Sequence, residues 1–270
     1  MNASVFKIKS INTLAGAWAW MARTARKVRI LTFHGIDRVA DDIFSITPQQ
    51  FKDFLTTLTE EGRQTIRAND LVERWPAVLQ DDNLVLLTFD DGYVCHREIV
   101  ADLLVQNGMT ATFFIVSSFV HRQRKCARFM NHERLFLSSD DLREMQAAGF
   151  EIGSHSHSHP LCGAIPADKF YQEALLSKQI LEDAIGHPIA SFSYPYGRKG
   201  AYTKTTMQIL RNIGYISAFT QEGLPLDPSS TLLELPRINI DRFDTVQSFR
   251  RKLYGYYEVV ARIRGYVKRS

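Results

Sequence analysis

The chain of 270 residues has little cysteine and no long apolar run. Its three cysteines are an odd number without zinc-knuckle or disulfide spacing, which favours a reducing compartment. No stretch reaches the ~20 apolar residues of a transmembrane helix. The sequence also lacks a phosphate-binding loop, a glycine-rich dinucleotide turn, internal repeats and low-complexity tracts. These absences argue against a disulfide-stabilised, membrane-spanning, dinucleotide-binding or repeat protein.

Acidic residues are missing from residues 1–30, which hold six basic ones. Residues 246–270 hold seven basic residues and a single glutamate. Because the chain carries +4 overall and +6 at each end, residues 31–245 carry −8. Two basic ends on an acidic body suggest an anionic partner surface, either lipid or polyphosphate. The acidic body and the lack of a base-reading motif argue against nucleic acid.

Both ends show the apolar spacing of amphipathic helices. We expect residues 1–27 to be a retained N-terminal segment, because no leucine-rich centre marks it as a signal peptide and Arg23 and Arg26 follow its apolar part. Residues 245–270 predict a basic C-terminal helix. Each segment could contact an anionic membrane or pack on the central domain, residues 28–244. We expect a cytoplasmic protein, with peripheral contact at the inner membrane face as the alternative.

Strands and helices are predicted to alternate along the central domain. Predicted strands cover residues 28–33, 64–66, 84–89, 110–116, 150–154, 190–194, 215–220 and 234–240. Predicted helices cover residues 48–61, 68–79, 94–106, 139–148, 167–185 and 203–212, and Pro76 is expected to end or kink the second of them. Residues 117–136 show no period and are expected to be a loop or insertion. This alternation predicts an α/β fold with a mostly parallel sheet, in a distorted or incomplete barrel rather than a short open sheet.

The central strand of this pattern ends in two carboxylates. Leu84 to Phe89 is an unbroken apolar and β-branched run, typical of a strand buried on both faces. Asp90, Asp91 and Gly92 follow it, at the strand end where catalytic groups of such sheets lie. Two adjacent buried carboxylates are unfavourable unless they bind something or serve different roles. The alternative is an ordinary loop with an Asp-Gly turn.

A histidine cluster follows a second predicted strand. His155 and His159 are four residues apart, a spacing that can direct two imidazoles at one ion. With Asp91 they would make a divalent metal site that leaves room for water. The metal would acidify that water and polarise a bound carbonyl, and Asp90 could then accept the proton. The alternative is a polar loop or adventitious metal binding.

Together these stretches resemble the polysaccharide deacetylases of the NodB-homology, carbohydrate esterase 4 type. The resemblance covers about residues 28–240. It rests on Thr88-Phe89-Asp90-Asp91-Gly92, on the segment Gly153 to Pro160, on Ser193-Tyr194-Pro195-Tyr196-Gly197 and on Leu235-Pro236-Arg237-Ile238. It implies a distorted (β/α) barrel of about seven strands. The motif order is most similar to that of poly-N-acetylglucosamine deacetylases.

The resemblance also implies roles for individual residues. Asp91, His155 and His159 would bind the metal, usually zinc, and Asp90 would be the general base. Tyr196, after Pro195, would stabilise the oxyanion through its backbone N–H. His157 matches no ligand position and is expected near the substrate or behind the ligands.

Two departures from the family pattern need other residues. Many members carry an arginine ahead of the Pro-Tyr pair, where Ser193 and Tyr194 stand here, so Arg237 is expected to supply that charge to the base. Many carry a late histidine as the general acid, but no histidine follows His187 here. His34, at the end of the first predicted strand, is expected to protonate the leaving amine, with a tuned pKa that lets it donate near neutral pH. Both residues could instead be structural.

The implied reaction is hydrolysis of an N-acetyl group from an amino-sugar polysaccharide or its lipid-linked precursor. An N-acetylated glycan would be the partner of the site, and zinc its expected cation. Alternatives are a catalytically silent glycan-binding barrel and a deacylase or deformylase that acts on another amide.

Overall fold

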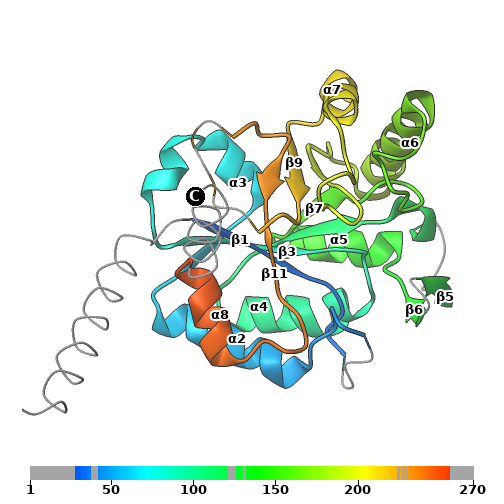
Figure 1. The fold of residues 1–270 in the computed structure, drawn as a ribbon. Helices are drawn as coiled ribbons and strands as arrows, with labels where there is room; N and C mark the ends of the chain where they lie inside the picture. The colour runs from blue at the N-terminus through cyan, green and yellow to red at the C-terminus, as the bar shows by residue number, and fades with distance from the viewer. Residues whose placement is uncertain are drawn as a thin grey trace, which may run out of the picture.

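The computed structural model describes residues 28–37, 42–120, 126–129, 132–223, 226, 228 and 230–255 (Figure 1). The predicted N-terminal segment and the end of the predicted C-terminal helix lie outside these residues. So do most of the basic residues of the predicted insertion.

A curled parallel sheet forms the centre of the molecule. Its strands are β1 (Arg29–Phe33), β3 (Leu84–Phe89), β4 (Thr112–Ile115), β7 (Glu151–Ser154), β8 (Ser191–Ser193), β9 (Ser217–Thr220), β10 (Leu235–Pro236) and β11 (Ile238–Asn239). Their order in the sheet is β10-β9-β8-β7-β4-β3-β1-β11. The short strand β2 (Gln64–Ile66) pairs with the start of β3.

The last two strands close the sheet into a barrel. β10 pairs with β9 at one edge and β11 pairs with β1 at the other, and both pairs are parallel. A single residue, Arg237, separates them. One interrupted strand therefore joins the two edges, and the described sheet has seven strands around its barrel if β10 and β11 count as one. This confirms the predicted distorted barrel.

Helices cover the outside of the sheet (Figure 1). They are α2 (Pro48–Glu60), α3 (Ala68–Glu73), α4 (Asp102–Gln106), α5 (Ser139–Ala147), α6 (Ala167–Ile185), α7 (Lys204–Ile213) and α8 (Val246–Leu253), with the π-helix η2 (His96–Ala101) before α4 and the 3₁₀ turns η1 (Ala77–Gln80) and η3 (Ser117–Phe119). Thr47 caps α2 and Pro48 takes its first position, as predicted.

Two segments differ in detail from the predictions. The helix predicted from residue 68 towards residue 79 ends at Glu73, before Pro76, which was expected to end or kink it because a proline disfavours helical geometry in the residue before it and has no N–H to donate. The segment predicted as a loop or insertion contains an antiparallel hairpin of β5 (Cys126–Phe129) and β6 (His132–Leu135). The hairpin pairs only with itself, so the alternation of the barrel strands could not signal it.

The described part of the predicted C-terminal helix, α8, packs on the barrel. The Phe249 ring stacks on Phe54 of α2 with centroids 4.4 Å apart, and Leu253 is also buried. Lys252 forms an ion pair with Asp244 at 2.5 Å. Phe249 and Leu253 therefore face the protein core. None of the described helices combines the length and apolar character needed to cross a bilayer.

The interior of the barrel changes from apolar to polar along its strands. Side chains alternate between the two faces of a strand. One set, Ile30, Leu86, Phe114, Phe219 and Leu235, forms a buried cluster drawn from five strands around the barrel. Continuing on the same face of β3, Thr88 and then Asp90 follow Leu86. The charged end of this interior is the carboxyl end of the strands.

Glu151 is a buried carboxyl at the other end of the barrel. It begins β7 and is 8% exposed. The backbone N–H of Asn69 and the hydroxyl of Ser191 donate to it at 2.8 and 2.9 Å. Burial nevertheless raises the pKa of Glu151 to about 6.

The pKa of Glu151 in the folded state lies above its ordinary value, so the protonated carboxyl stabilises the fold. This contribution to stability is fully present below about pH 4.5 and is lost as the pH rises through about 6. Glu151→Gln cannot ionise. Wild type should therefore lose roughly 2 kcal/mol of unfolding free energy relative to Glu151→Gln between about pH 4 and about pH 8. Urea unfolding measures this, with the exposed Glu73→Gln as control. Parallel pH profiles for wild type and Glu151→Gln would contradict it.

Candidate metal and active site

The predicted site residues follow the carboxyl ends of different strands. His34 comes after β1, Asp91 after β3, His155 after β7 and Tyr196 after β8. These four residues and His159 line one cavity of about 450 Å³. The parallel sheet thus gathers residues that are far apart in the sequence at one end of the barrel.

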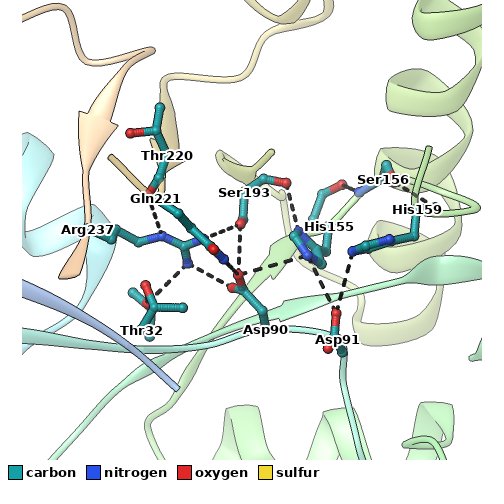
Figure 2. A network of polar contacts seen from close by, with 12 residues as sticks. Thr32, Asp90, Asp91, His155, Ser156, His159, Ser193, Thr220, Gln221 and Arg237 are labelled. Carbon is teal, nitrogen blue, oxygen red and sulfur yellow. Dashed lines mark hydrogen bonds and ion pairs between the residues drawn. The ribbon is translucent and has the colours of Figure 1, made fainter. Parts of the chain in front are cut away.

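Asp91, His155 and His159 form a possible metal-binding group. Their ligand atoms lie within 4.8 Å of one another. An Asp91 oxygen is 3.6 Å from Nε2 of His155 and 3.7 Å from Nε2 of His159 (Figure 2). Nδ1 of His155 lies 2.8 Å from the carbonyl oxygen of Ser193. Because a carbonyl only accepts, Nδ1 carries the proton and Nε2 presents its lone pair to the group.

The charge state of the group also fits a cation. Burial lowers the pKa of both imidazoles, that of His159 to about 3, so both are neutral near pH 7. Burial and the charge of Asp90 raise the pKa of Asp91 to about 7. Two neutral imidazoles and a carboxyl whose ionisation a nearby positive charge would favour are the donors expected for a divalent cation.

The loops that present these residues have a strained backbone. Four non-glycine residues in the described chain have a φ in the left-handed region: Asp91 at 78°, Ser156 at 64°, His159 at 60° and Tyr196 at 63°. Each belongs to one of the three motif segments of the site. Such conformations cost ~1–3 kcal/mol each and persist where surrounding contacts enforce them. Here Ser156 accepts a hydrogen bond from the His159 N–H at 3.0 Å and fixes that turn.

Asp90 lies beside the metal group and is held by Arg237. Both residues are fully buried. The guanidinium donates to the two Asp90 oxygens at 2.7 Å each and to the Ser193 hydroxyl and the Thr220 carbonyl at 2.7 and 3.1 Å (Figure 2). Its remaining N–H group donates to the Thr88 hydroxyl at 3.1 Å. All five of its N–H groups have an acceptor. The structure thus brings together the two residues that the sequence analysis paired.

The ion pair decides the ionisation of Asp90. Burial alone would raise the pKa of Asp90, but the charge of Arg237, with His155 and the hydrogen bonds of the guanidinium, holds that pKa well below its ordinary value. Asp90 and Asp91 are neighbours in the chain, yet their pKa values move in opposite directions. Environments that separate two carboxyls in this way are typical of distinct chemical roles.

His34 lies at the cavity, as predicted. Burial lowers the pKa of His34 to about 4, although the charge of Asp90 opposes this shift. His96 donates a hydrogen bond from Nε2 to the His34 carbonyl at 2.8 Å, and this fixes the backbone rather than the imidazole. Desolvation thus outweighs the attraction to Asp90, and the role of His34 as the general acid stays a prediction.

The remaining predicted residues differ in position. Tyr196 lines the cavity, and its ring lies edge-on to His159 with centroids 4.9 Å apart. Pro195 is buried before it. His157 is not brought to the cavity wall; its Nδ1 lies 3.0 Å from the Ser117 hydroxyl.

Sequence reasoning missed several residues of the cavity. Tyr93 lines it and hydrogen bonds to Asp91. Its position two residues after Asp91 could have indicated this. Gln221 donates to Asp90 at 3.4 Å and accepts from Asn239 at 3.0 Å. Only the pairing of strands brings these two amides to the site, so no local signal in the sequence could have found them.

Comparison with known proteins shows which family the chain resembles. A family model described as polysaccharide deacetylase matches residues 78–218. YxkH of Bacillus subtilis (strain 168), which carries the name polysaccharide deacetylase, is 24% identical over 228 residues, covering 83% of this chain and 75% of YxkH.

Two solved structures have a similar fold. The deacetylase PplD of Streptococcus pyogenes has a TM-score of 0.74 at 21% identity, covering 84% of this chain and 98% of PplD. IcaB from Ammonifex degensii has a TM-score of 0.68 at 20% identity, covering 85% of this chain and 97% of IcaB. At these identities the structures bear on the fold alone. Because the family match spans more than half of its sequence, this chain belongs to the polysaccharide deacetylase family and is a hydrolase of carbon–nitrogen bonds other than peptide bonds.

Proposed function

We propose that this enzyme removes N-acetyl groups from an amino-sugar-containing polysaccharide or its lipid-linked precursor, with zinc as the expected cation. The observation that carries the proposal is the contact between two units. One is the group of Asp91, His155 and His159, and the other is the buried pair of Asp90 and Arg237. His155 joins them, because its Nε2 lies 3.6 Å from Asp91 and 3.9 Å from Asp90.

The metal group offers one carboxylate oxygen and two imidazole nitrogens. This donor set suits zinc in catalytic sites and is shared by other first-row metals. A bound cation would lower the pKa of a water molecule and polarise the acetyl carbonyl. The role of His155 and His159 is to hold the cation as neutral ligands, and Asp91 supplies the negative charge.

Asp90 serves as the general base. Arg237 keeps it ionised over the working pH range, so that it can accept a proton from water. The same ion pair makes Asp90 a weak base, because a carboxylate whose pKa is held low has little affinity for a proton. This weakness is tolerable only for an acidified water, which agrees with a cation beside it.

The remaining residues act on the amide. The backbone N–H of Tyr196 donates to the oxygen that becomes negative as water adds to the carbonyl carbon. The proton that Asp90 accepts from water passes to the imidazole of His34, which delivers it to the amide nitrogen as the C–N bond breaks. Acetate and a free amino sugar are the products.

The first test is acetate release from N-acetylglucosamine oligomers and from a lipid-linked acetylated sugar. With zinc we expect turnover, and chelation should abolish it. Asp90→Asn should lower kcat by ~10²–10⁴-fold, since the amide cannot accept the proton. Turnover that survives both chelation and Asp90→Asn would sink the proposal. Tight metal binding without acetate release would favour a silent glycan-binding barrel, and release of formate alone from a formylated sugar would favour a deformylase.

Removal of the Arg237 charge should move the pH profile of the reaction. The guanidinium lowers the pKa of Asp90, so without it burial prevails and the pKa rises. In Arg237→Ala the acid limb of kcat/KM should therefore shift to higher pH. The variant should also lose ~3–5 kcal/mol of stability, because a buried charge is left unpaired. Arg237→Lys, which keeps a charge, should shift the limb less, and the exposed Arg242→Ala should not shift it. An unmoved acid limb in a folded Arg237→Ala enzyme would exclude this role.

Replacement of His34 tests whether this residue is the general acid or has only a structural role. In His34→Ala we expect kcat to fall by ~10²-fold or more with KM nearly unchanged, because the proton transfer occurs only in the transition state. Steady-state kinetics with zinc present measure both constants, and the exposed His187→Ala is the control. A His34→Ala enzyme that changes KM alone would defeat the assignment.

A further inference from the structure

One wall of the catalytic cavity is formed by two aliphatic or aromatic side chains without a polar group, whereas the other lining residues carry polar groups. Ile43 and Phe44 line the cavity and are 50% and 38% exposed. Most of the other lining side chains are charged or are histidines and amides, among them Arg198, Gln221 and Asn239. Exposure of large apolar side chains to water at an open cavity is unfavourable, and a ligand that covers them removes this cost. The wall is therefore a candidate contact for the substrate.

The Phe44 ring lies next to the proposed acid. Its centroid is 5.0 Å from that of the His34 ring, with 33° between the two planes. The ring is thus packed on one neighbour and still 38% exposed. A ligand that contacts Phe44 would lie within reach of the imidazole that protonates the leaving nitrogen.

The backbone of residues 42–46 is held in place before any ligand arrives. Asp42 accepts hydrogen bonds from the N–H groups of Phe44 and Ser45 at 2.7 and 2.8 Å. Arg134 of β6 donates to Asp42 at 2.5 Å and to the Ser45 hydroxyl at 3.1 Å. Ile43 accepts a backbone hydrogen bond from Arg242 at 3.0 Å. The hairpin and the loop after β11 thus hold the wall from two sides.

The close approach of this wall to β1 requires a glycine. A Cβ at Gly35 would lie against the Ser45 hydroxyl at less than contact distance. The backbone N–H of Ile46 donates to the Gly35 carbonyl at 3.0 Å. Gly35 follows His34 directly, so the glycine couples the position of the wall to that of the imidazole.

We propose that Phe44, with Ile43 beside it, is a stacking platform for a pyranose ring of the glycan. A pyranose has an apolar C–H face and a polar hydroxyl rim. The electron-rich face of an aromatic ring attracts C–H groups, and a ring held in advance loses little entropy on binding. Gln221 and Asn239 offer amides to the hydroxyls, and Oδ1 of Asn239 is buried without a hydrogen-bond partner. The inference rests on the proposed function, because it takes the glycan as the occupant.

A platform that contacts only non-reacting parts of the sugar has a distinct kinetic signature. It binds the sugar equally in the ground state and in the transition state, so its loss raises KM and leaves kcat unchanged. A ring that only positions His34 would have the opposite signature. The two roles of Phe44 can therefore be separated by experiment.

The test uses the full chain with zinc and compares Phe44→Ala, Phe44→Leu and Phe44→Trp. Phe243→Ala is the matched control, because Phe243 is 73% exposed and does not line the cavity. Steady-state acetate release from N-acetylglucosamine oligomers gives KM and kcat. Calorimetry with glucosamine oligomers gives Kd without turnover, and thermal unfolding checks that each variant is folded.

In Phe44→Ala both KM and Kd should rise about tenfold with kcat within about twofold of wild type. Phe44→Trp should match wild type, Phe44→Leu should be intermediate, and Phe243→Ala should change nothing. Unchanged KM and Kd in Phe44→Ala, or a lower kcat with unchanged KM, would overturn the platform. If wild type releases no acetate but binds oligomers, the proposed function fails while the binding series still decides the platform. A wild type that binds no oligomer overturns both.

Discussion

The ion pair of Arg237 and Asp90 is the interaction on which both the closure of the barrel and the state of its site depend. Arg237 stands where the last strand passes from β9 to β1, so closure of the sheet buries its guanidinium completely. A buried unpaired charge costs several kcal/mol. The strand can therefore close only over a carboxylate, and Asp90 is that carboxylate. The contact that completes the fold also orients both oxygens of the proposed base.

Asp90 and Asp91 differ in ionisation because the chain turns away from the direction of β3 at Asp91, which places the two carboxyls in different environments. Asp90 continues the inward-facing series of β3 above Leu86 and Thr88 and meets a fixed positive charge. Asp91 has left the strand, with a φ of 78°, and meets two neutral imidazoles instead. The first carboxyl needs no further partner, whereas the second is costly to ionise without a cation. The strain of the turn is thus linked to a division of roles that a regular strand could not provide.

Local patterns predicted the parts of the site that lie within single motifs. The apolar run before Asp90 predicted a buried strand, and the four-residue spacing of His155 and His159 predicted two of the three residues in the possible metal-binding group. The contact of Arg237 with Asp90 was expected only because the chain lacks the arginine that many family members carry ahead of the Pro-Tyr pair. In the sequence, 147 residues separate Arg237 from Asp90. Gln221 and Phe44 carry no local signal, because only barrel closure and the hairpin bring them to the cavity. The lowered pKa of His34 was missed because burial cannot be read from a strand end.

The resting charges of the site suit a reaction that supplies its own proton. Asp90 is ionised and His34 is neutral near pH 7, so Asp90 is unprotonated and His34 is not an imidazolium before the substrate binds. Hydrolysis of an amide adds one water, whose proton leaves as the oxygen attacks and is required again at the nitrogen. His34 is already within the field of Asp90, which raises its proton affinity. On the proposed function, negative charge that develops on the amide raises that affinity further. The acid would then be charged only while the reaction needs it, and a low resting pKa becomes compatible with its role.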